Sequence, residues 1–174
     1  MEYNSVLLAV SPVTFECSVI ELSRHLRVDS VSRLNPAASR EIAAHQTVAD
    51  AVDIMRQDRT GCLLVTRNGQ LVGIFTERDL LKNVLAVGLP LSASISEVMT
   101  EHPVSVRLKD PIQVAIQRMQ EGSYRHLPVI DDDNRPIGIL SVKRIVHYLV
   151  EHFPNTIYNQ PPDPHRYPDA PEGA

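Results

Sequence analysis

A threonine and an aspartate, Thr76 and Asp79, stand three residues apart directly after the apolar run 71–75. This spacing is typical of a capping box, in which the two side chains bond backbone N–H groups at the start of a helix. The same groups could hold a sugar, because a carboxylate accepts hydrogen bonds from adjacent ribose hydroxyls and a threonine hydroxyl can bond sugar or phosphate. A helix N-terminus beside them would favour an anion. Two interpretations stay open, a helix cap and a nucleotide site.

Other residue types suggest little catalytic or metal chemistry. The seven histidines are scattered without an HExxH motif, and the two cysteines, Cys17 and Cys62, form no CxxC. The sequence has no GxSxG, P-loop or GxGxxG motif, and no nucleophile with an oriented base. We therefore expect no enzyme activity and no metal site. The acidic run 131–133 lies where a turn is expected, and we interpret it as a solvated loop.

Composition indicates a soluble globular protein. The chain has 174 residues, 43% of them hydrophobic and 22% charged, with a net charge of −4. This charge and an aromatic content of 5% without tryptophan argue against nucleic-acid binding. No apolar run reaches the roughly 18 residues of a membrane helix, and the N-terminus lacks the basic start of a secretory signal. We expect a cytoplasmic location and reduced cysteines.

The chain repeats itself at a distance of 64 residues. The apolar positions Val48, Ala51, Val52 and Met55 fall on Ile112, Ala115, Ile116 and Met119. After a one-residue insertion, 73–76 falls on 138–141. We predict an N-terminal extension at 1–30, a first repeat at 31–88, a second repeat at 89–152 and a tail at 153–174. The extension should add a strand or helix at the edge. The tail holds six of the thirteen prolines and should be disordered or lie on a partner.

Each repeat has the pattern of a β-α-β-β-α unit. The first strands are predicted at 41–44 and 104–107, each followed by a helix with apolar residues at i, i+3, i+4 and i+7. Thr47 with Asp50 predicts a capping box for the first helix, and Asp110 before a proline predicts the cap of the second. Asn68 before glycine predicts a hairpin. Leu80, Leu81, Val84 and Leu85 should line one side of the closing helix. The fold class is therefore α+β, with two repeats packed sheet to sheet with pseudo-twofold symmetry around a shared core.

At this point the sequence resembles a tandem pair of CBS domains, often called a Bateman module. The resemblance rests on the repeated unit and on the segments GIFTERDLL, YRHLPV and VMTEHPVSV, and it covers roughly residues 31 to 150. It implies binding of an adenosine compound in a cleft between the repeats, most often AMP, ADP or ATP and sometimes S-adenosylmethionine or NAD. It also implies a regulatory protein that is not a catalyst, and commonly an association of two modules, here a homodimer.

The resemblance also implies roles for individual residues. Asp79 would bind the ribose with Thr76 beside it, and Arg125 and His126 would meet phosphate. Candidate neighbours of the adenine come from the first repeat and rest on the resemblance alone: Ile42, Ala43, Gly61, Cys62 and Leu63.

The second repeat departs from this pattern. It has Ser141 where the first has Thr76, and Arg144 where the first has Asp79. Arginine has donors only and cannot accept from a ribose diol. Lys143 and Arg144 could instead reach the phosphates of a nucleotide held by the first repeat, or they could be a solvated basic pair in the first turn of a helix.

The main functional hypothesis is a regulatory module that senses an adenine nucleotide and signals to a protein target. One alternative is a dimeric scaffold protein with a vestigial cleft, which the aspartate-to-arginine exchange in the second repeat motivates. Another is a module for S-adenosylmethionine or NAD. We expect no nucleic-acid or membrane partner and no required cofactor.

Overall fold

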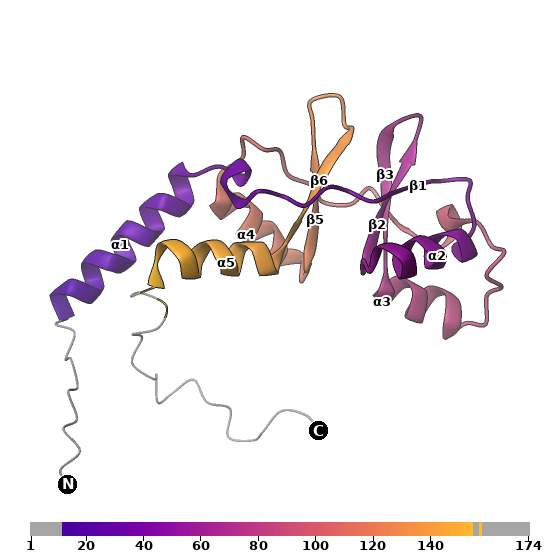
Figure 1. Cartoon of the computed structure of the whole chain (residues 1–174), viewed down its shortest axis with the longest axis horizontal. Helices are drawn as coiled ribbons and strands as arrows, with labels where there is room; N and C mark the ends of the chain where they lie inside the picture. The colour runs from indigo at the N-terminus through magenta and orange to yellow at the C-terminus, as the bar shows by residue number, and fades with distance from the viewer. Residues whose placement is uncertain (1–11, 155–156, 158–174) are drawn as a thin grey trace, which may run out of the picture.

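The computed structural model describes residues 12–154 and 157 of the chain (Figure 1). Most of the predicted proline-rich tail, 153–174, lies outside the described residues, as does the start of the predicted extension. The described part of that extension is helix α1, Pro12–Val28. Among the described residues, no helix combines the length and apolar character needed to cross a membrane.

The first repeat has the predicted order of elements, and the second has the same order without its first strand. The first contains β1 Glu41–Ala43, α2 Val48–Asp58, β2 Cys62–Arg67, β3 Gln70–Thr76, the short helix α3 Glu77–Asp79 and its π-helical continuation η2 Leu80–Leu85. The second contains α4 Ile112–Gly122, β5 His126–Ile130, β6 Pro136–Ser141 and α5 Val142–His152. The leading segment of the predicted first repeat contains the 3-10 turn η1 Val31–Leu34. The leading segment of the predicted second repeat contains the 3-10 turn η3 Ile95–Glu97 and the short strand β4 Thr100–Glu101. The α+β fold class is confirmed.

The sheet of the first repeat has the order β1-β2-β3-β4, with β1 parallel to β2 and the other pairs antiparallel. The predicted hairpin joins β2 to β3, and Asn68 and Gly69 both have positive φ, at 54° and 76°. In the second repeat, β5 and β6 pair antiparallel. The strand predicted at 104–107 is reduced to a single parallel bridge between Val106 and Val129.

Each repeat is completed by the segment that leads into the other. Strand β4, in the leading segment of the second repeat, pairs with β3 of the first. Correspondingly, Ala37 forms a bridge to Ile139 in β6 of the second repeat. The cores show the same exchange, because Ile95 and Val98 pack in the first repeat while Val31 and Leu34 pack in the second. Figure 1 shows both connecting segments running between the two hairpins. The exchange ties the two repeats into one unit.

The apolar interior is divided into three clusters, where the sequence predicted one shared core. One cluster fills each repeat beneath its helices, and the third lies between the two sheets. Strand β2 explains the division, since alternate side chains of a strand point to opposite faces. Leu63 and Val65 enter the core of the first repeat, whereas Cys62 and Leu64 join the cluster between the sheets with Ile130 and Ile139 of the second repeat.

The predicted helix starts are partly correct. The Thr47–Asp50 capping box is confirmed, because the Thr47 N–H donates to Asp50 Oδ2 at 2.9 Å and the Asp50 N–H donates to Thr47 Oγ1 at 3.2 Å. The cap predicted at Asp110 is wrong by one residue, since Pro111 is the N-cap of α4. The Asp110 carboxylate instead accepts from the Arg107 N–H at 3.0 Å. It therefore secures the turn before the helix.

The predicted apolar side of the closing helix is wrong for two of its four residues. Val84 is fully buried, but the side chains of Leu81 and Leu85 are 60% and 57% exposed. Each lies one residue further along the helix than Leu80 or Val84, so its side chain points away from the inward-facing side. Within the described chain these two leucines form an uncovered apolar surface.

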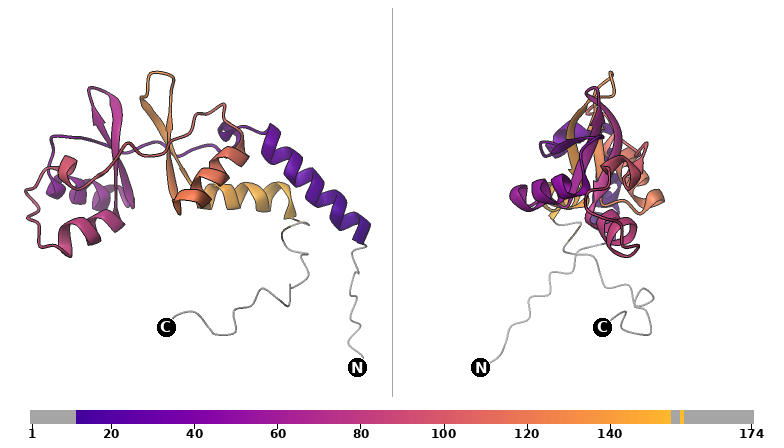
Figure 2. Two further views of the ribbon diagram at one scale, coloured as in Figure 1. Left: turned by 180° about the vertical axis from the view of Figure 1, so that it is seen from behind. Right: turned by 90° about the vertical axis from the view of Figure 1, so that its right-hand side faces the viewer.

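Helix α1 lies at the end of the molecule that holds the second repeat, far from the first (Figure 2). Its side chains Leu22 and Leu26 pack against the core of the second repeat. Directly after the helix, the carboxylate of Asp29 accepts a hydrogen bond from the Tyr148 hydroxyl of α5. Asp29 thus joins the end of α1 to the closing helix.

Candidate functional site

A cleft of about 340 Å³ opens between the two repeats. The first repeat contributes Gly61, Ile74 and the end of β3 with α3, 76–79. The segment leading into the second repeat contributes 100–104, and the second repeat itself contributes 123–126 and Pro128. Because β4 pairs with β3, the exchange of leading segments places residues 100–104 beside the Thr76–Asp79 turn.

The Thr76–Asp79 pair forms the predicted capping box. Asp79 Oδ2 accepts from the Thr76 N–H at 2.9 Å and from the Thr76 hydroxyl at 2.6 Å, and the Asp79 N–H donates to Thr76 Oγ1 at 3.3 Å. These bonds use one carboxylate oxygen. The other, Oδ1, accepts only from the Thr100 hydroxyl, at 3.4 Å, among the described residues. The cap therefore leaves acceptor capacity on a residue that lines the cleft, and the two interpretations of this motif are compatible.

Arg125 and His126 line the same cleft from the second repeat. Arg125 is exposed, and its carbonyl oxygen accepts from the Val142 N–H at 3.0 Å. His126 begins β5 and is half-buried. Burial lowers the pKa of His126; Glu77 opposes this effect and Arg125 adds to it. Burial therefore favours the neutral form of the His126 ring.

The residues predicted to surround an adenine are not brought together. Gly61 lines the cleft, with its carbonyl oxygen accepting from the Glu77 N–H at 3.1 Å. Ile42 and Leu63 are buried in the core of the first repeat. Cys62 is buried between the sheets, and burial raises the pKa of its thiol to about 12. Ala43 lines a separate hollow beside the β2–β3 hairpin.

Lys143 and Arg144 do not line the cleft. Both lie in the first turn of α5, where the N-cap Ser141 makes no side-chain capping bond. The Arg144 guanidinium donates to the carbonyl oxygen of Asn35, in the segment leading into the first repeat. Arg144 therefore bridges the second repeat and the leading segment at the position that corresponds to Asp79.

The cleft contains residues that the sequence did not single out. Thr100, His102 and Val104 belong to the segment VMTEHPVSV, but their approach to Thr76 depends on a long-range pairing that no local pattern predicts. Tyr124 stands directly before Arg125 in the segment YRHLPV and was also missed. The charged lining sets two guanidinium groups against three carboxylates, contributed by Arg78, Arg125, Glu77, Asp79 and Glu101. These five groups alone carry a net charge of −1.

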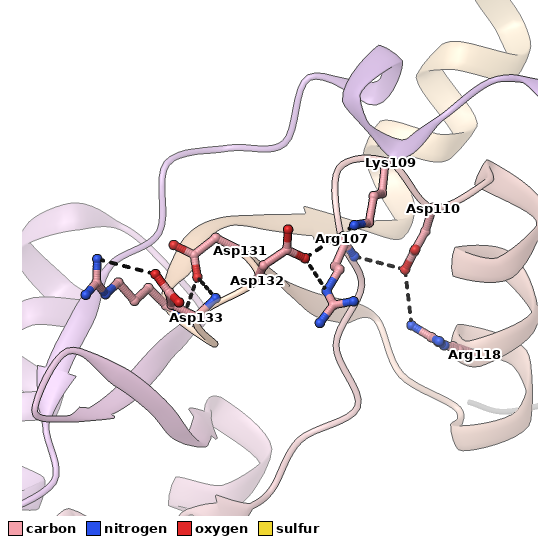
Figure 3. A network of polar contacts seen from close by, with 8 residues as sticks. Arg107, Lys109, Asp110, Arg118, Asp131, Asp132 and Asp133 are labelled. Carbon is pink, nitrogen blue, oxygen red and sulfur yellow. Dashed lines mark hydrogen bonds and ion pairs between the residues drawn. The ribbon is translucent and has the colours of Figure 1, made fainter.

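The acidic run 131–133 lies in the β5–β6 turn, as predicted, but its side chains are engaged by protein groups (Figure 3). Asp132 is 3.3 Å from both Arg107 and Lys109. Asp131 Oδ1 accepts from the backbone N–H groups of Asp133 and Arg135 at 2.9 and 2.8 Å. The run thus stabilises the turn. Within the described part of the chain, no group of three or more His, Cys, Asp or Glu side chains could hold a metal ion.

Comparison with known proteins agrees with this architecture. A sequence model of the CBS domain matches residues 41–86 and 95–151. The meiotically up-regulated gene 70 protein of Schizosaccharomyces pombe is 37% identical over 102 residues, which are 58% of this chain. Several curated relatives are much longer, and this chain spans 14%, 20% and 24% of the length of three of them.

Two solved structures share the fold. The CBS-domain structure of NE2398 is 30% identical with a TM-score of 0.64, and the match covers 70% of this chain and 98% of the other. The structure of CBSX2 in complex with AMP is 24% identical with a TM-score of 0.62, and the match covers 71% and 97% of the two chains. The family model matches both repeats and, taken together, more than half of the chain. The chain therefore belongs to the CBS-domain family, as a tandem pair of CBS domains.

Proposed function

We propose that this protein is a regulatory module that senses an adenine nucleotide in the cleft between its two repeats. The observation that carries this proposal is the convergence of Asp79, Thr100, Arg125 and His126 on one cleft of about 340 Å³. A carboxylate with a free acceptor suits a ribose diol, and a guanidinium suits phosphate oxygens. The AMP complex of CBSX2, which shares the fold, supports the same class of ligand.

The charge of the lining favours AMP among the adenine nucleotides. Two guanidinium groups, Arg78 and Arg125, face three carboxylates across the lining. Each added phosphate brings further negative charge into a cleft that is already slightly negative, and like charges raise the cost of binding. AMP should therefore bind more tightly than ADP, and ADP more tightly than ATP.

The two walls of the cleft belong to different repeats, so a bound ligand could change how the repeats pack and thereby signal to a protein target. Thr76 and Asp79 belong to the first repeat, whereas Arg125 and His126 belong to the second. A ligand that contacts both walls stabilises one packing of the repeats, to the extent that its affinity for the two packings differs. A protein target that distinguishes these packings would then read the nucleotide level. This role requires binding and no catalysis.

The proposal includes a homodimer as the working form. Both closing helices carry large apolar side chains that are exposed in the single chain, Leu81 and Leu85 in the first repeat and Val142 and Val146 in the second. Exposed apolar surface of this kind commonly marks a protein–protein contact. Sedimentation of the wild type beside a Leu81→Glu, Leu85→Glu variant would test this, because the dimer should dissociate in the variant.

Two other functions have specific support. A scaffold with a vestigial cleft is supported by the bridge from Arg144 to Asn35 in the second repeat. A module for S-adenosylmethionine is supported by the negative lining, because that ligand carries a sulfonium cation. The scaffold requires no small ligand, whereas the other candidate predicts a different ligand in the same cleft.

A thermal-shift panel separates these candidates. AMP, ADP, ATP, S-adenosylmethionine and NAD are tested on the wild type, on Asp79→Ala and on Asp50→Ala. The last is a matched control, because Asp50 forms the same capping box at the start of α2, outside the lining of the cleft. A ligand at a hundred times its dissociation constant stabilises by about 2.7 kcal/mol, or roughly 5 to 10 °C for a chain of this size. We expect that shift with AMP in the wild type and in Asp50→Ala only. No shift with any ligand would favour the scaffold.

A further inference from the structure

The hollow beside the β2–β3 hairpin, here called the hairpin hollow, has a volume of about 610 Å³. It lies at the carboxyl ends of β1 and β2, which run parallel and are joined by α2. In α/β units, ligands commonly bind at this edge of the sheet. The lining comes from the end of β1, the β2–β3 turn and the start of η3: Ala43, Ala44, His45, Thr66, Arg67, Asn68, Gly69, Ser94 and Ser96. The hairpin hollow shares no lining residue with the cleft, so it is a separate feature.

The side chains of the hairpin hollow include hydrogen-bond donors and no carboxylate. Arg67 and His45 are exposed, and neither forms an ion pair within the described part of the chain. The Ser94 hydroxyl donates to the Ala44 carbonyl at 3.1 Å, and the Ser96 hydroxyl lies 2.8 Å from that of Ser94. The Ser96 proton can therefore turn toward a ligand. In a chain with a net charge of −4, such a lining favours an anion.

The second repeat has a matching place, and its backbone shows the correspondence. The 64-residue offset places Ser30, Ser32, Lys109 and Asp132 on Ser94, Ser96, His45 and Asn68. Ser94 forms a bridge to Thr47 before α2, and Ser30 forms the corresponding bridge to Pro111 before α4. The hydroxyls of Ser30 and Ser32 are 2.6 Å apart, as those of Ser94 and Ser96 are 2.8 Å apart. The two places are therefore built alike.

In the second repeat, this place is supplied with a carboxylate by the protein itself. Asp132 lies 3.3 Å from both Arg107 and Lys109, and Figure 3 shows its side chain pointing toward them. The first repeat has Asn68 at the position of Asp132, and it has Arg67 where the second repeat has Asp131. The cationic side is thus kept in the first repeat, while both acidic side chains are replaced.

We propose that the hairpin hollow is a second ligand site, which binds a carboxylate group through Arg67, His45 and Ser96. The carboxylate of the ligand takes the part that Asp132 plays in the second repeat. A guanidinium offers two parallel N–H donors to a carboxylate, and an imidazole and a hydroxyl each donate a further hydrogen bond. A small carboxylic acid or an acidic side chain of a partner protein can supply this group. The proposal is independent of the nucleotide cleft.

The first test is an NMR titration of the full chain with two probes at constant ionic strength, maintained with chloride. Succinate represents a small carboxylic acid, and a tetraglutamate peptide with blocked ends represents an acidic segment of a partner. We expect saturable shifts of the amide signals of 67–69 and 94–96, and the probe that binds more tightly indicates the source. The absence of saturable shifts with both probes would overturn the proposal.

The second test removes the guanidinium. Arg67→Ala should weaken binding of the better probe about 10- to 150-fold, the range expected for charge-assisted hydrogen bonds. Arg56→Ala is the matched control, because Arg56 is an exposed arginine on α2 outside the hairpin hollow. The same affinity in Arg67→Ala and in the wild type would overturn the proposal. AMP affinity should not change in Arg67→Ala, since Arg67 does not line the cleft.

The third test exchanges the two repeats at one position. Asn68→Asp places a carboxylate beside Arg67 and should weaken the probe at least tenfold, because the protein then supplies the anion itself. Asn68→Gly is the control, since glycine accepts the positive φ of 54° and adds no charge. Asp132→Asn should free Arg107 and Lys109 and add a second probe site per chain. Full affinity in Asn68→Asp, or unchanged stoichiometry in Asp132→Asn, would overturn the proposal.

Discussion

The two repeats present the same backbone to the space between them but use it for different purposes. In the first repeat, Thr76 and Asp79 cap a helix with one carboxylate oxygen and leave the other to the cleft. In the second, Ser141 makes no capping bond and Arg144 bridges to the Asn35 carbonyl. The acceptor Asp79 in the first repeat is replaced by the donor Arg144 in the second. This one exchange separates a candidate ligand site from a structural contact.

The closing helices show a second difference at corresponding positions. In the first repeat, Asn83 donates to the Val98 carbonyl at 3.0 Å, which holds the leading segment of the second repeat. In the second repeat, Tyr148 is buried and its hydroxyl donates to the carboxylate of Asp29, which holds the end of α1. The second repeat thus carries the stronger, charge-assisted contact. We infer that it serves as the anchoring half and the first as the ligand-responsive half.

The largest expected effect is a difference in AMP affinity between variants of the two capping boxes, Thr76–Asp79 and Thr47–Asp50. Asp79→Ala should weaken AMP at least 100-fold, because hydrogen bonds to a charged group contribute about 1.5 to 3 kcal/mol each and a ribose offers two hydroxyls. Asp50→Ala should bind AMP normally, although both variants lose about 1 kcal/mol of helix capping. Calorimetry and urea denaturation measure the two effects. An equal loss of AMP affinity in both variants would show that Asp79 acts only as a helix cap and does not bind the ribose.

The second prediction tries to convert the second repeat into a copy of the first. Arg144→Asp restores a carboxylate three residues after the Ser141 hydroxyl and removes the bridge to Asn35. We expect a second, weaker AMP site per chain, detected by calorimetry. Arg144→Ala removes the same bridge without adding an acceptor and should keep the original stoichiometry. A second site in both variants would show that the bridge to Asn35, and not the missing acceptor, keeps AMP from this position.

Much of this comparison could be predicted from the sequence. The 64-residue repeat fixed the order of elements, and the spacing of Thr76 and Asp79 predicted the capping box that the structure contains. The exchange of Asp79 for Arg144 was visible in the same alignment. These features are local, so residue types and spacing are enough to find them.

The features that could not be predicted from the sequence depend on contacts between residues that are far apart in the chain. The pairing of β4 with β3 joins segments of different repeats and brings Thr100 to Asp79. Strand β2 is buried on both faces, so its continuous apolar run did not show that Leu63 points into the core. Tyr124 enters the cleft because a Schellman motif ends α4 at Ser123, where no glycine marks the turn.

The third prediction compares the two contacts of the closing helices. Tyr148→Phe should lower the free energy of unfolding by about 2 kcal/mol, because it removes a buried donor to a carboxylate, whereas Asn83→Ala should cost about 1 kcal/mol. Urea denaturation of both variants measures the difference. An equal or larger loss for Asn83→Ala would contradict the assignment of the second repeat as the anchoring half.

The same contact has a pH dependence of known sign. The hydrogen bond from Tyr148 is the largest cause that lowers the pKa of Asp29 from its ordinary value of 3.8. A carboxyl group with a lowered pKa contributes stability above its unfolded pKa and loses it as the pH falls through the folded pKa. The difference between the wild type and Tyr148→Phe should therefore be full at pH 7 and shrink below pH 3.8. A difference that stays constant down to pH 2 would mean that the hydroxyl acts by packing alone.

The smallest expected effect concerns His126, which the second repeat contributes to the cleft. Its pKa is lowered mainly by burial, and a bound phosphate should raise it. Binding then takes up a proton, so AMP affinity should rise a few-fold as the pH falls from 8 to 6. His126→Gln is the control, because the phosphate of AMP also gains a proton near pH 6. The same pH dependence in that variant would remove His126 from the phosphate contact.

The central claim is that the cleft beside Asp79 binds the nucleotide and that the corresponding position in the second repeat, at Arg144, does not. Titration calorimetry of the wild-type chain with AMP, repeated with Asp79→Ala, tests it most directly. We predict one AMP per chain for the wild type and none for Asp79→Ala. Two AMP molecules per wild-type chain, or one that remains in Asp79→Ala, would contradict the claim and place the nucleotide elsewhere.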